Sequence, residues 1–260
     1  MKVLWVFAHP EPRSFNGSLR DFGVRRLEAA GHEVRQSDLY AMRWKAVADG
    51  DDFLDPSVSE RLVYATASFN GFKSGTQTPD IAAEQEKLKW ADAIIFQFPL
   101  WWFSVPAILK GWFDRVLAAG WAYRVPDPTT AGRSLRYGDG NLKGRRGLII
   151  TTVGGSEKSL GPRGVGGDIH DHLVPVNYGV LWYTGVAPLP AHVIYEANRV
   201  DAETYLKIER SLAARLDGLF TDAPIPYRTQ SGGDYDNDLV LKPGLEGDNR
   251  GFAIRQKTDL

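Results

Sequence analysis

Residues 94–116, IIFQFPLWWFSVPAILKGWFDRV, contain the pattern that decides the fold of this chain. An apolar run typical of a buried strand ends at Pro99, and a helix with apolar residues at three- and four-residue intervals follows from Pro106. Four large side chains, Leu100 to Phe103, stand between these two elements. Core packing would account for one of the aromatics but not for all of them on one turn. Ligands of open α/β sheets bind at the carboxyl ends of strands, so this turn is predicted to hold a flat aromatic ligand.

Strands and helices alternate along the rest of the chain as well. Strands are expected at residues 3–8, 33–39, 93–98, 147–153 and 191–195. Helices are expected from Ser14 or Asn16 to residue 30, and at residues 80–91, 106–117, 170–185 (bent at Pro175) and 202–220. The turn-rich residues 41–78 are predicted to form an irregular but packed loop. This order predicts an α/β fold, a three-layer sandwich around a five-stranded parallel sheet.

The composition of the chain changes after Phe220. Residues 221–260 are rich in Pro, Gly, Asp and Asn, and they contain only short apolar pieces. We therefore predict one domain at residues 1–220 and a C-terminal extension at residues 221–260, rather than a second core.

Composition excludes several classes of function. Lys and Arg total 31 against 32 Asp and Glu, so no basic field exists to attract nucleic acid. The chain has no cysteine, which excludes disulfides, a thiol nucleophile and an iron–sulfur cluster. The apolar run at the start is interrupted by His9 and Pro10, and no later segment is long enough to span a bilayer. These features predict a soluble cytoplasmic protein.

Three loops at the carboxyl ends of strands are candidates for a binding site. The first carries His9, Ser14, Phe15 and Asn16 before a helix N-terminus, where free N–H groups can hold a phosphate. A capped helix with an exposed histidine fits this loop equally well. It lacks the GxGxxG and GxxxxGK patterns of dinucleotide-binding and P-loop proteins. The second loop is the aromatic turn. The third, TTVGG at residues 151–155, lets a ligand approach the backbone, although strands often end in glycine.

Together these loops resemble those of the flavodoxin-like NAD(P)H:quinone oxidoreductases, the DT-diaphorase or modulator of drug activity B type of family. The similar pieces occur in order between about residue 3 and about residue 220. They are AHPEPRSFNGSL, SDLYAM, TPDIAAEQEKL, the stretch from residue 94 to residue 116, WAY at residues 121–123, and TT followed by GG near Thr151.

The resemblance implies a flavin site made from all three loops. FAD is the expected cofactor, with FMN as the alternative, and NAD(P)H is the expected reductant. The implied cofactor-binding residues are His9, Ser14, Phe15 and Asn16 at the phosphates, Pro99, Leu100, Trp102 and Phe103 around the isoalloxazine ring, and Thr151, Thr152, Gly154 and Gly155 at the opposite edge.

The family's FAD enzymes are homodimers in which an aromatic wall of the partner covers the flavin. By resemblance, the residues expected to contact the acceptor are Trp102, Phe103, Tyr123 and Tyr183. Val125 stands where a second tyrosine of this wall would be expected. The C-terminal extension is expected to pack on its own domain or on the dimer partner.

The family resemblance is weakest in the glycine-rich segment that follows the fourth strand. Leu160 and Gly166 stand where mammalian-type quinone reductases carry a Tyr and a His that relay a proton. The candidates to replace this relay are Arg163, His170 and His172, and each of them also fits an exposed loop residue. The sequence HDH lacks the further ligands that a metal site would need, so no metal is expected.

The mechanism implied by the resemblance is hydride transfer from NAD(P)H to flavin N5, departure of the oxidised nicotinamide, and two-electron reduction of a quinone-like acceptor. Two alternatives remain open at this point. A flavin-bound regulatory or electron-carrier partner would share the fold, and a nitro- or azoreductase would use the same site with another acceptor.

Overall fold

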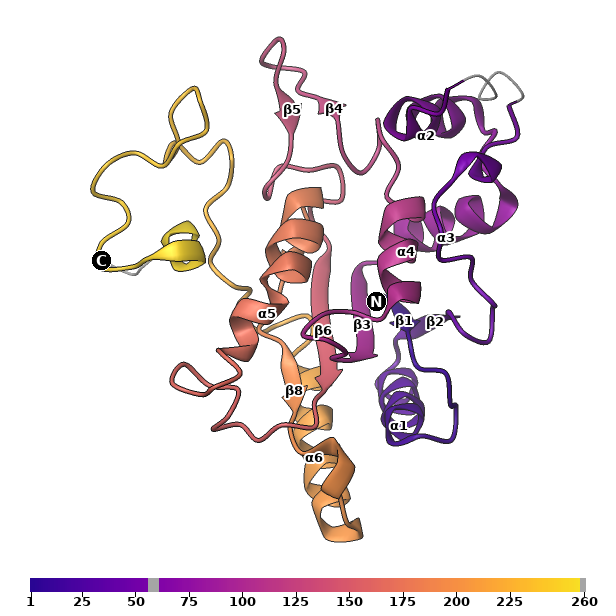
Figure 1. Ribbon diagram of the computed structural model, residues 1–260, viewed down its shortest axis with the longest axis vertical. Coiled ribbons are helices and arrows are strands. Elements are labelled where there is room, and N and C mark those ends of the chain that lie inside the picture. The colour runs from indigo at the N-terminus through magenta and orange to yellow at the C-terminus, as the bar shows by residue number, and fades with distance from the viewer. Residues whose placement is uncertain (56–60, 258–260) are drawn as a thin grey trace.

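The computed structural model describes residues 1–55 and 61–257, and a parallel sheet forms its centre (Figure 1). Its strand order is β2-β1-β3-β6, and β7 and β8 both pair with the free side of β6. Because β7 lies beside the start of β6 and β8 beside its end, the two short strands share one position. The expected five-stranded parallel sheet is therefore confirmed. The strands are β1 (Lys2–Phe7), β2 (Glu33–Asp38), β3 (Ala93–Pro99), β6 (Arg146–Thr152), β7 (Ala187–Pro188) and β8 (His192–Ile194).

Helices cover both faces of the sheet. The helices are α1 (Phe15–Ala29), α2 (Tyr64–Ser74), α3 (Pro79–Trp90), α4 (Ala107–Val116), α5 (Ile169–Val176) and α6 (Ala202–Asp217). Val3, Trp5 and Phe7 of β1 belong to the apolar cluster that includes residues of α1 and α6. Leu4 and Val6 point the other way, into the cluster that contains residues of α3, α4 and α5. In Figure 1, α1 and α6 lie toward the bottom, whereas α4 and α5 lie beside the upper parts of β3 and β6.

The ends of the helices follow the expected capping pattern. Ser14, one of the two candidates, caps α1 by accepting a hydrogen bond from the Gly17 N–H, and Asp201 caps α6 through the Thr204 N–H. Helix α6 ends at Asp217, three residues earlier than expected, and Gly218 follows it. No helix in the described ranges is both long and apolar enough to cross a bilayer.

The prediction of an irregular segment at residues 41–78 was wrong. In the described residues, the segment contains the helix α2 and the 3-10 turn Gly50–Asp52. The buried face of α2 consists of Ala67, Ser68 and Gly71, so it shows no apolar stripe in the sequence. Phe53 packs so closely against Gly71 that a Cβ there would lie 2.9 Å from its ring. Residues 56–60 of this segment lie outside the described residues.

Two further details differ from the expected elements. Helix α5 ends one residue after Pro175, and the chain continues as the π-helical segment η3 (Asn177–Trp182). A small hairpin, β4 (Val125–Pro126) with β5 (Ser134–Leu135), also forms between α4 and β6. Its two-residue strands are too short to give an alternating pattern in the sequence.

The first part of the C-terminal extension packs on its own domain. The Ile225 N–H donates to the Pro188 carbonyl at 2.8 Å, and Trp182 Nε1 donates to the Arg228 carbonyl at 3.1 Å. Beyond Gln230 the chain forms a loop that returns through the 3-10 turn η5 (Gly251–Arg255), drawn in yellow in Figure 1. Residues 258–260 of the predicted extension lie outside the described residues.

Candidate functional site

The three loops of the sequence prediction meet at the carboxyl ends of β1, β3 and β6. Between them lies a cavity of about 330 Å³. Eight of the twelve predicted cofactor-binding residues line it: His9, Ser14, Phe15, Asn16, Pro99, Leu100, Thr152 and Gly154. The other four belong to the same loops but do not line this cavity: Trp102, Phe103, Thr151 and Gly155.

The loop before α1 is held in a tight turn. Ser14 Oγ lies 3.0 Å from His9 Nδ1 and accepts from the Gly17 N–H at 3.1 Å. A Cβ on Gly17 would lie only 1.9 Å from the Pro12 carbonyl oxygen, so glycine is required here. The N–H groups of Phe15 and Asn16, in the first turn of α1, have no intrahelical acceptor. This helix end can therefore accept a phosphate at the wall of the cavity.

Buried hydrogen bonds fix this loop to the sheet beneath it. Gln97, fully buried on β3, accepts from Trp5 Nε1 at 2.9 Å and donates to the Asn16 carbonyl at 2.8 Å. The hydroxyl of Thr152 lies 3.0 Å from Asn16 Nδ2 and 3.2 Å from Asn16 Oδ1. Thr151 Oγ1 likewise donates inward, to the Phe98 carbonyl. These polar side chains are thus used to position the loop, and the backbone N–H groups of the loop are left to bind a ligand.

The aromatic turn has an unusual backbone. Trp101 and Ser104 exchange two backbone hydrogen bonds of 3.0 Å, and the two residues between them, Trp102 and Phe103, have φ values of +51° and +57°. Such turns favour Asn and Gly, so two bulky aromatic residues are strained here. Their side chains are also exposed, Trp102 at 95% and Phe103 at 53%. Strain and exposed aromatic surface together are typical of a binding site.

Four lining residues were not among the predicted cofactor-binding residues. Trp101 and Val153 belong to the second and third predicted loops, whereas Ala197 and Asn198 lie outside all three. A Cβ on Gly154 would lie 3.3 Å from Asn198 Nδ2, so glycine at this position lets the amide approach the edge of the cavity. Asn198 follows β8 at the same end of the sheet as the other loops, and this position after a strand was the one signal available in the sequence.

The glycine-rich segment brings one of the three proton-relay candidates to the aromatic turn. The ring of His172 lies 4.9 Å from the ring of Phe103, centroid to centroid, and its Nε2 lies 2.6 Å from the Gly166 carbonyl oxygen. Arg163 and His170 are exposed to solvent. Of the three candidates, His172 therefore has the contacts expected of a group at the site.

Two of the predicted acceptor-binding residues lie elsewhere in the chain. Tyr123 and Tyr183 line a separate cavity of about 310 Å³ between α4 and η3, which shares no residue with the cavity at the three loops. Burial raises the pKa of Tyr123, so its hydroxyl stays protonated at neutral pH. Ser104, which follows Phe103 in the aromatic turn, lines this second cavity as well, whereas Trp102 and Phe103 line neither of the two cavities.

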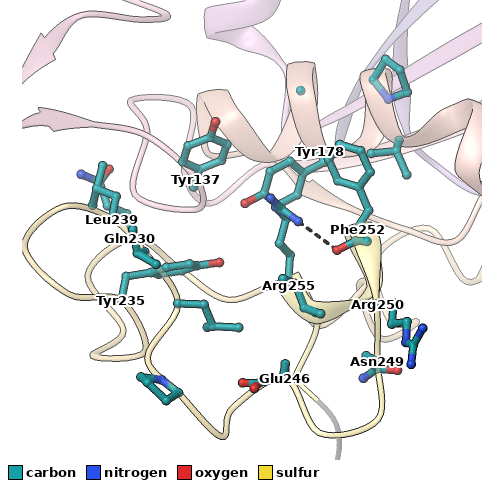
Figure 2. A pocket seen from close by; sticks show the side chains of 18 residues that line it. Tyr137, Tyr178, Gln230, Tyr235, Leu239, Glu246, Asn249, Arg250, Phe252 and Arg255 are labelled. Carbon is teal, nitrogen blue, oxygen red and sulfur yellow. Dashed lines mark hydrogen bonds between the residues drawn. The ribbon is translucent and has the colours of Figure 1, made fainter.

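A larger cavity, of about 1070 Å³, lies between the domain and the C-terminal extension (Figure 2). Its walls include Tyr137 and Tyr178 of the domain and Tyr235 and Phe252 of the extension, and Phe252 lies beside Tyr178. The amide nitrogen of Gln230 and the hydroxyl of Tyr235 are buried here without a hydrogen-bond partner. None of the predicted site residues lines this cavity.

Comparisons with known proteins agree with this geometry. The Flavodoxin_2 family model, described as a flavodoxin-like fold, matches residues 1–216. The chain is 41% identical to a ribosyldihydronicotinamide dehydrogenase-like protein of Penicillium crustosum, over 100% of this chain and 97% of the relative. It is 36% identical to NAD(P)H dehydrogenase [quinone] 1 of Rattus norvegicus, over 88% and 81% of the two chains.

A solved structure extends the similarity to the C-terminal extension. The crystal structure of a protein from Klebsiella pneumoniae assigned as a quinone reductase is 49% identical. It superimposes with a TM-score of 0.95 and covers 98% of this chain and 99% of its own. The chain therefore belongs to the family with the flavodoxin-like fold and, within it, to the NAD(P)H:quinone oxidoreductase flavoenzymes.

Proposed function

We propose that this protein is an FAD-dependent enzyme that uses NAD(P)H to reduce a quinone-like acceptor by two electrons. One observation carries the proposal: a helix N-terminus, the aromatic turn after β3 and the glycine edge after β6 all border one cavity. When bound there, the flavin would accept a hydride from the nicotinamide and pass two electrons to the acceptor. The residues of this chain hold the cofactor, place the acceptor and keep water away.

The shape of the site favours FAD over FMN. A second hollow, of about 320 Å³, shares Phe15, Ala197 and Asn198 with the cavity at the three loops. It extends past the N-terminus of α1 to Tyr205 on α6, whose ring lies 6.0 Å from that of Phe15. The two hollows form a groove with an aromatic far end, which suits the adenosine half of a dinucleotide.

Each loop has a distinct task in this proposal. The N–H groups of Phe15 and Asn16 would bind the diphosphate, with Ser14 and His9 completing the turn. Pro99, Leu100, Trp102 and Phe103 would cradle the isoalloxazine ring, and residues 151–155 would border its opposite edge. The acceptor would then stack beside Trp102 and Phe103, whose exposed rings offer a flat apolar surface.

We infer that the active unit is a homodimer. Trp102 is 95% exposed, and Tyr123 and Tyr183 line a cavity that Trp102 does not line. A second copy would cover the aromatic turn with these tyrosines and exclude water from the acceptor. Light scattering of the purified protein should give a dimer, and a mixture of Trp102→Ala and Tyr183→Ala chains should regain part of the activity that each variant lacks. Activity in a strictly monomeric protein would contradict this inference.

The flavin and the reductant can be identified directly. The mass of the compound released on denaturation should be that of FAD, and NAD(P)H oxidation should depend on an added quinone. Dihydronicotinamide riboside, tested in parallel, separates the two kinds of reductant named among the relatives. Faster turnover with a nitro or azo compound would favour a nitro- or azoreductase, and a bound flavin without NAD(P)H oxidation would favour a regulatory or electron-carrier partner. A cytoplasmic location stays a prediction, with which the absence of cysteine is compatible.

A further inference from the structure

We propose that the cavity between the domain and the C-terminal extension is a second binding site, which takes a flat aromatic molecule that carries a carboxylate. We call it the extension cavity, and its residues come from α5, η3, Tyr137 and the chain after Phe220. Its volume of about 1070 Å³ is at the upper end of the range of small-molecule sites and far exceeds a packing defect. It shares no residue with the cavity at the three loops, so the inference goes beyond the proposed function.

Aromatic rings form one wall of the extension cavity. The rings of Tyr137 and Tyr178 are stacked with their centroids 5.0 Å apart, and the ring of Phe252 lies 6.1 Å from that of Tyr178. Phe252 is 51% exposed and Val240, also in the lining, is 59% exposed. The cavity therefore offers apolar surface that the protein itself leaves uncovered, and a flat aromatic molecule stacks well on such a wall.

Hydrogen-bond donors face this space without an acceptor. The Tyr235 hydroxyl is buried and has no partner in the described residues, and Figure 2 shows it pointing from the extension toward Tyr178 and Arg255. Gln230 is 7% exposed, and its Oε1 accepts from the Arg136 N–H at 3.1 Å, whereas its Nε2 is buried without a partner. Buried polar groups in proteins are normally paired, so an oxygen atom of a ligand is the natural acceptor here.

The neighbouring phenols are donors as well. Burial, helped by the Tyr235 hydroxyl close by, raises the pKa of Tyr178 above its usual value of 10. Burial also raises the pKa of Tyr137, and Tyr183 adds to this effect. Both hydroxyls therefore stay protonated at neutral pH and can donate to a bound oxygen.

The charge of the lining favours an anion. The guanidinium of Arg255 lies 4.9 Å from the centroid of the Phe252 ring and donates to the Gly251 carbonyl at 3.0 Å. In the part of the chain that the structure describes, no carboxylate forms an ion pair with it. Glu246 is the one carboxylate of the lining, against the two cations Arg250 and Arg255. A carboxylate on the ligand would give Arg255 a charged partner beside the free hydroxyl of Tyr235.

A direct binding measurement tests the site. The probe is 2-naphthoate, a flat aromatic carboxylate, titrated by calorimetry into the purified protein with its flavin bound. We expect saturable binding, and 2-naphthamide, which has the same rings without the charge, should bind about tenfold more weakly. The absorbance of the flavin should not change, because the two cavities share no residue. No binding of 2-naphthoate, or a flavin spectrum that changes in step with binding, would overturn the proposal.

Two variants locate the bound probe. Tyr235→Phe removes only a hydroxyl that has no partner, and it should weaken binding of 2-naphthoate about tenfold. Arg255→Met keeps an apolar stem without the charge and should weaken it by about 10- to 100-fold. Tyr40→Phe and Arg210→Met are the matched controls, since neither residue lines the extension cavity, and both should bind as wild type. Unchanged affinity in Tyr235→Phe and Arg255→Met would place the probe elsewhere and contradict the proposal.

Tyr235→Phe also gives a test without a ligand. Because the hydroxyl is buried without a partner, its removal should raise Tm by about 2–4 °C, and 2-naphthoate should then stabilise the variant less than the wild type. A lower Tm would show that the hydroxyl already has a partner in the protein, which would contradict the argument.

The competing occupant of the extension cavity is a segment of a second copy of the chain. In that case the dimer would not bind 2-naphthoate, and Arg255→Met would shift the protein toward the monomer in light scattering. This result would overturn the proposal, whereas binding of 2-naphthoate to an unchanged oligomer would support it.

Discussion

The two sides of the cavity are built in different ways. On the phosphate side, residues 9–17 rest on Gln97 and Thr152, whose polar atoms all pair within the protein. On the acceptor side, residues 101–104 and 160–172 combine two strained aromatic residues with large exposed rings. The phosphate side is thus rigid before any ligand arrives, because breaking it would leave buried polar groups unpaired. The acceptor side exposes its aromatic rings to solvent, and a partner chain or a ligand would cover them.

The largest expected effect comes from breaking the rigid side at Gln97. Gln97→Leu leaves both Trp5 Nε1 and the Asn16 carbonyl without partners in the buried region. Two such losses should lower the free energy of unfolding by about 4 kcal/mol, measured by urea titration, and flavin affinity should fall as well. Gln36→Leu, on the exposed surface of β2, is the control and should change stability by less than about 0.5 kcal/mol. A small loss at Gln97 would mean that the network does not hold the loop.

A pH titration tests a buried group of the sheet that has no hydrogen-bond partner for one of its nitrogens. His192 on β8 pairs in register with Ile150 of β6, and its Nε2 is buried without a partner. Burial, helped by the charge of Arg215, lowers its pKa from 6.5 to about 4. Since the unfolded chain binds this proton more readily, stability is full above pH 6.5 and falls as the pH drops toward 4. We expect a loss of roughly 2–3 kcal/mol over this window, from urea titrations at several pH values.

His192→Gln should remove this loss of unfolding free energy at acid pH, because the glutamine side chain has no proton to take up. His170→Gln, at an exposed position, should leave the loss of unfolding free energy at acid pH unchanged. If the His192→Gln protein showed the same pH dependence as the wild type, the loss of stability at acid pH would come from other groups.

The contrast between the two sides also explains which features the sequence could predict. The strands β1, β3 and β6 are continuous apolar runs, and their ends carry the loops, so the sheet and the place of the cavity were predictable. Helix α2 was missed because small residues form its buried face. The residue types of the aromatic turn were evident, but its left-handed backbone was not, since Trp and Phe rarely adopt it.

Contacts between distant segments were beyond the sequence. The pairing of Asn16 with Thr152 joins residues 136 positions apart, and it uses the Asn16 side chain to support the loop. The contact between His172 and Phe103 depends on how α5 packs beside the turn, and sequence alone therefore left three candidates for the proton donor equal.

The smallest expected effect is the most informative about the acceptor side, because its two parts have opposite signs. Trp102→Gly removes a bulky side chain from a φ of +51°, so the free energy of unfolding should rise by about 1 kcal/mol. The same change removes an exposed ring from the acceptor surface, and KM for the quinone should rise by up to about tenfold. Arg43→Gly is the matched control. Arg43 has the same φ of 51°, but it does not line the cavity. It should gain similar stability without a change in KM. If Trp102→Gly lost stability, the turn would not be strained, and the two sides of the cavity would differ in exposure alone.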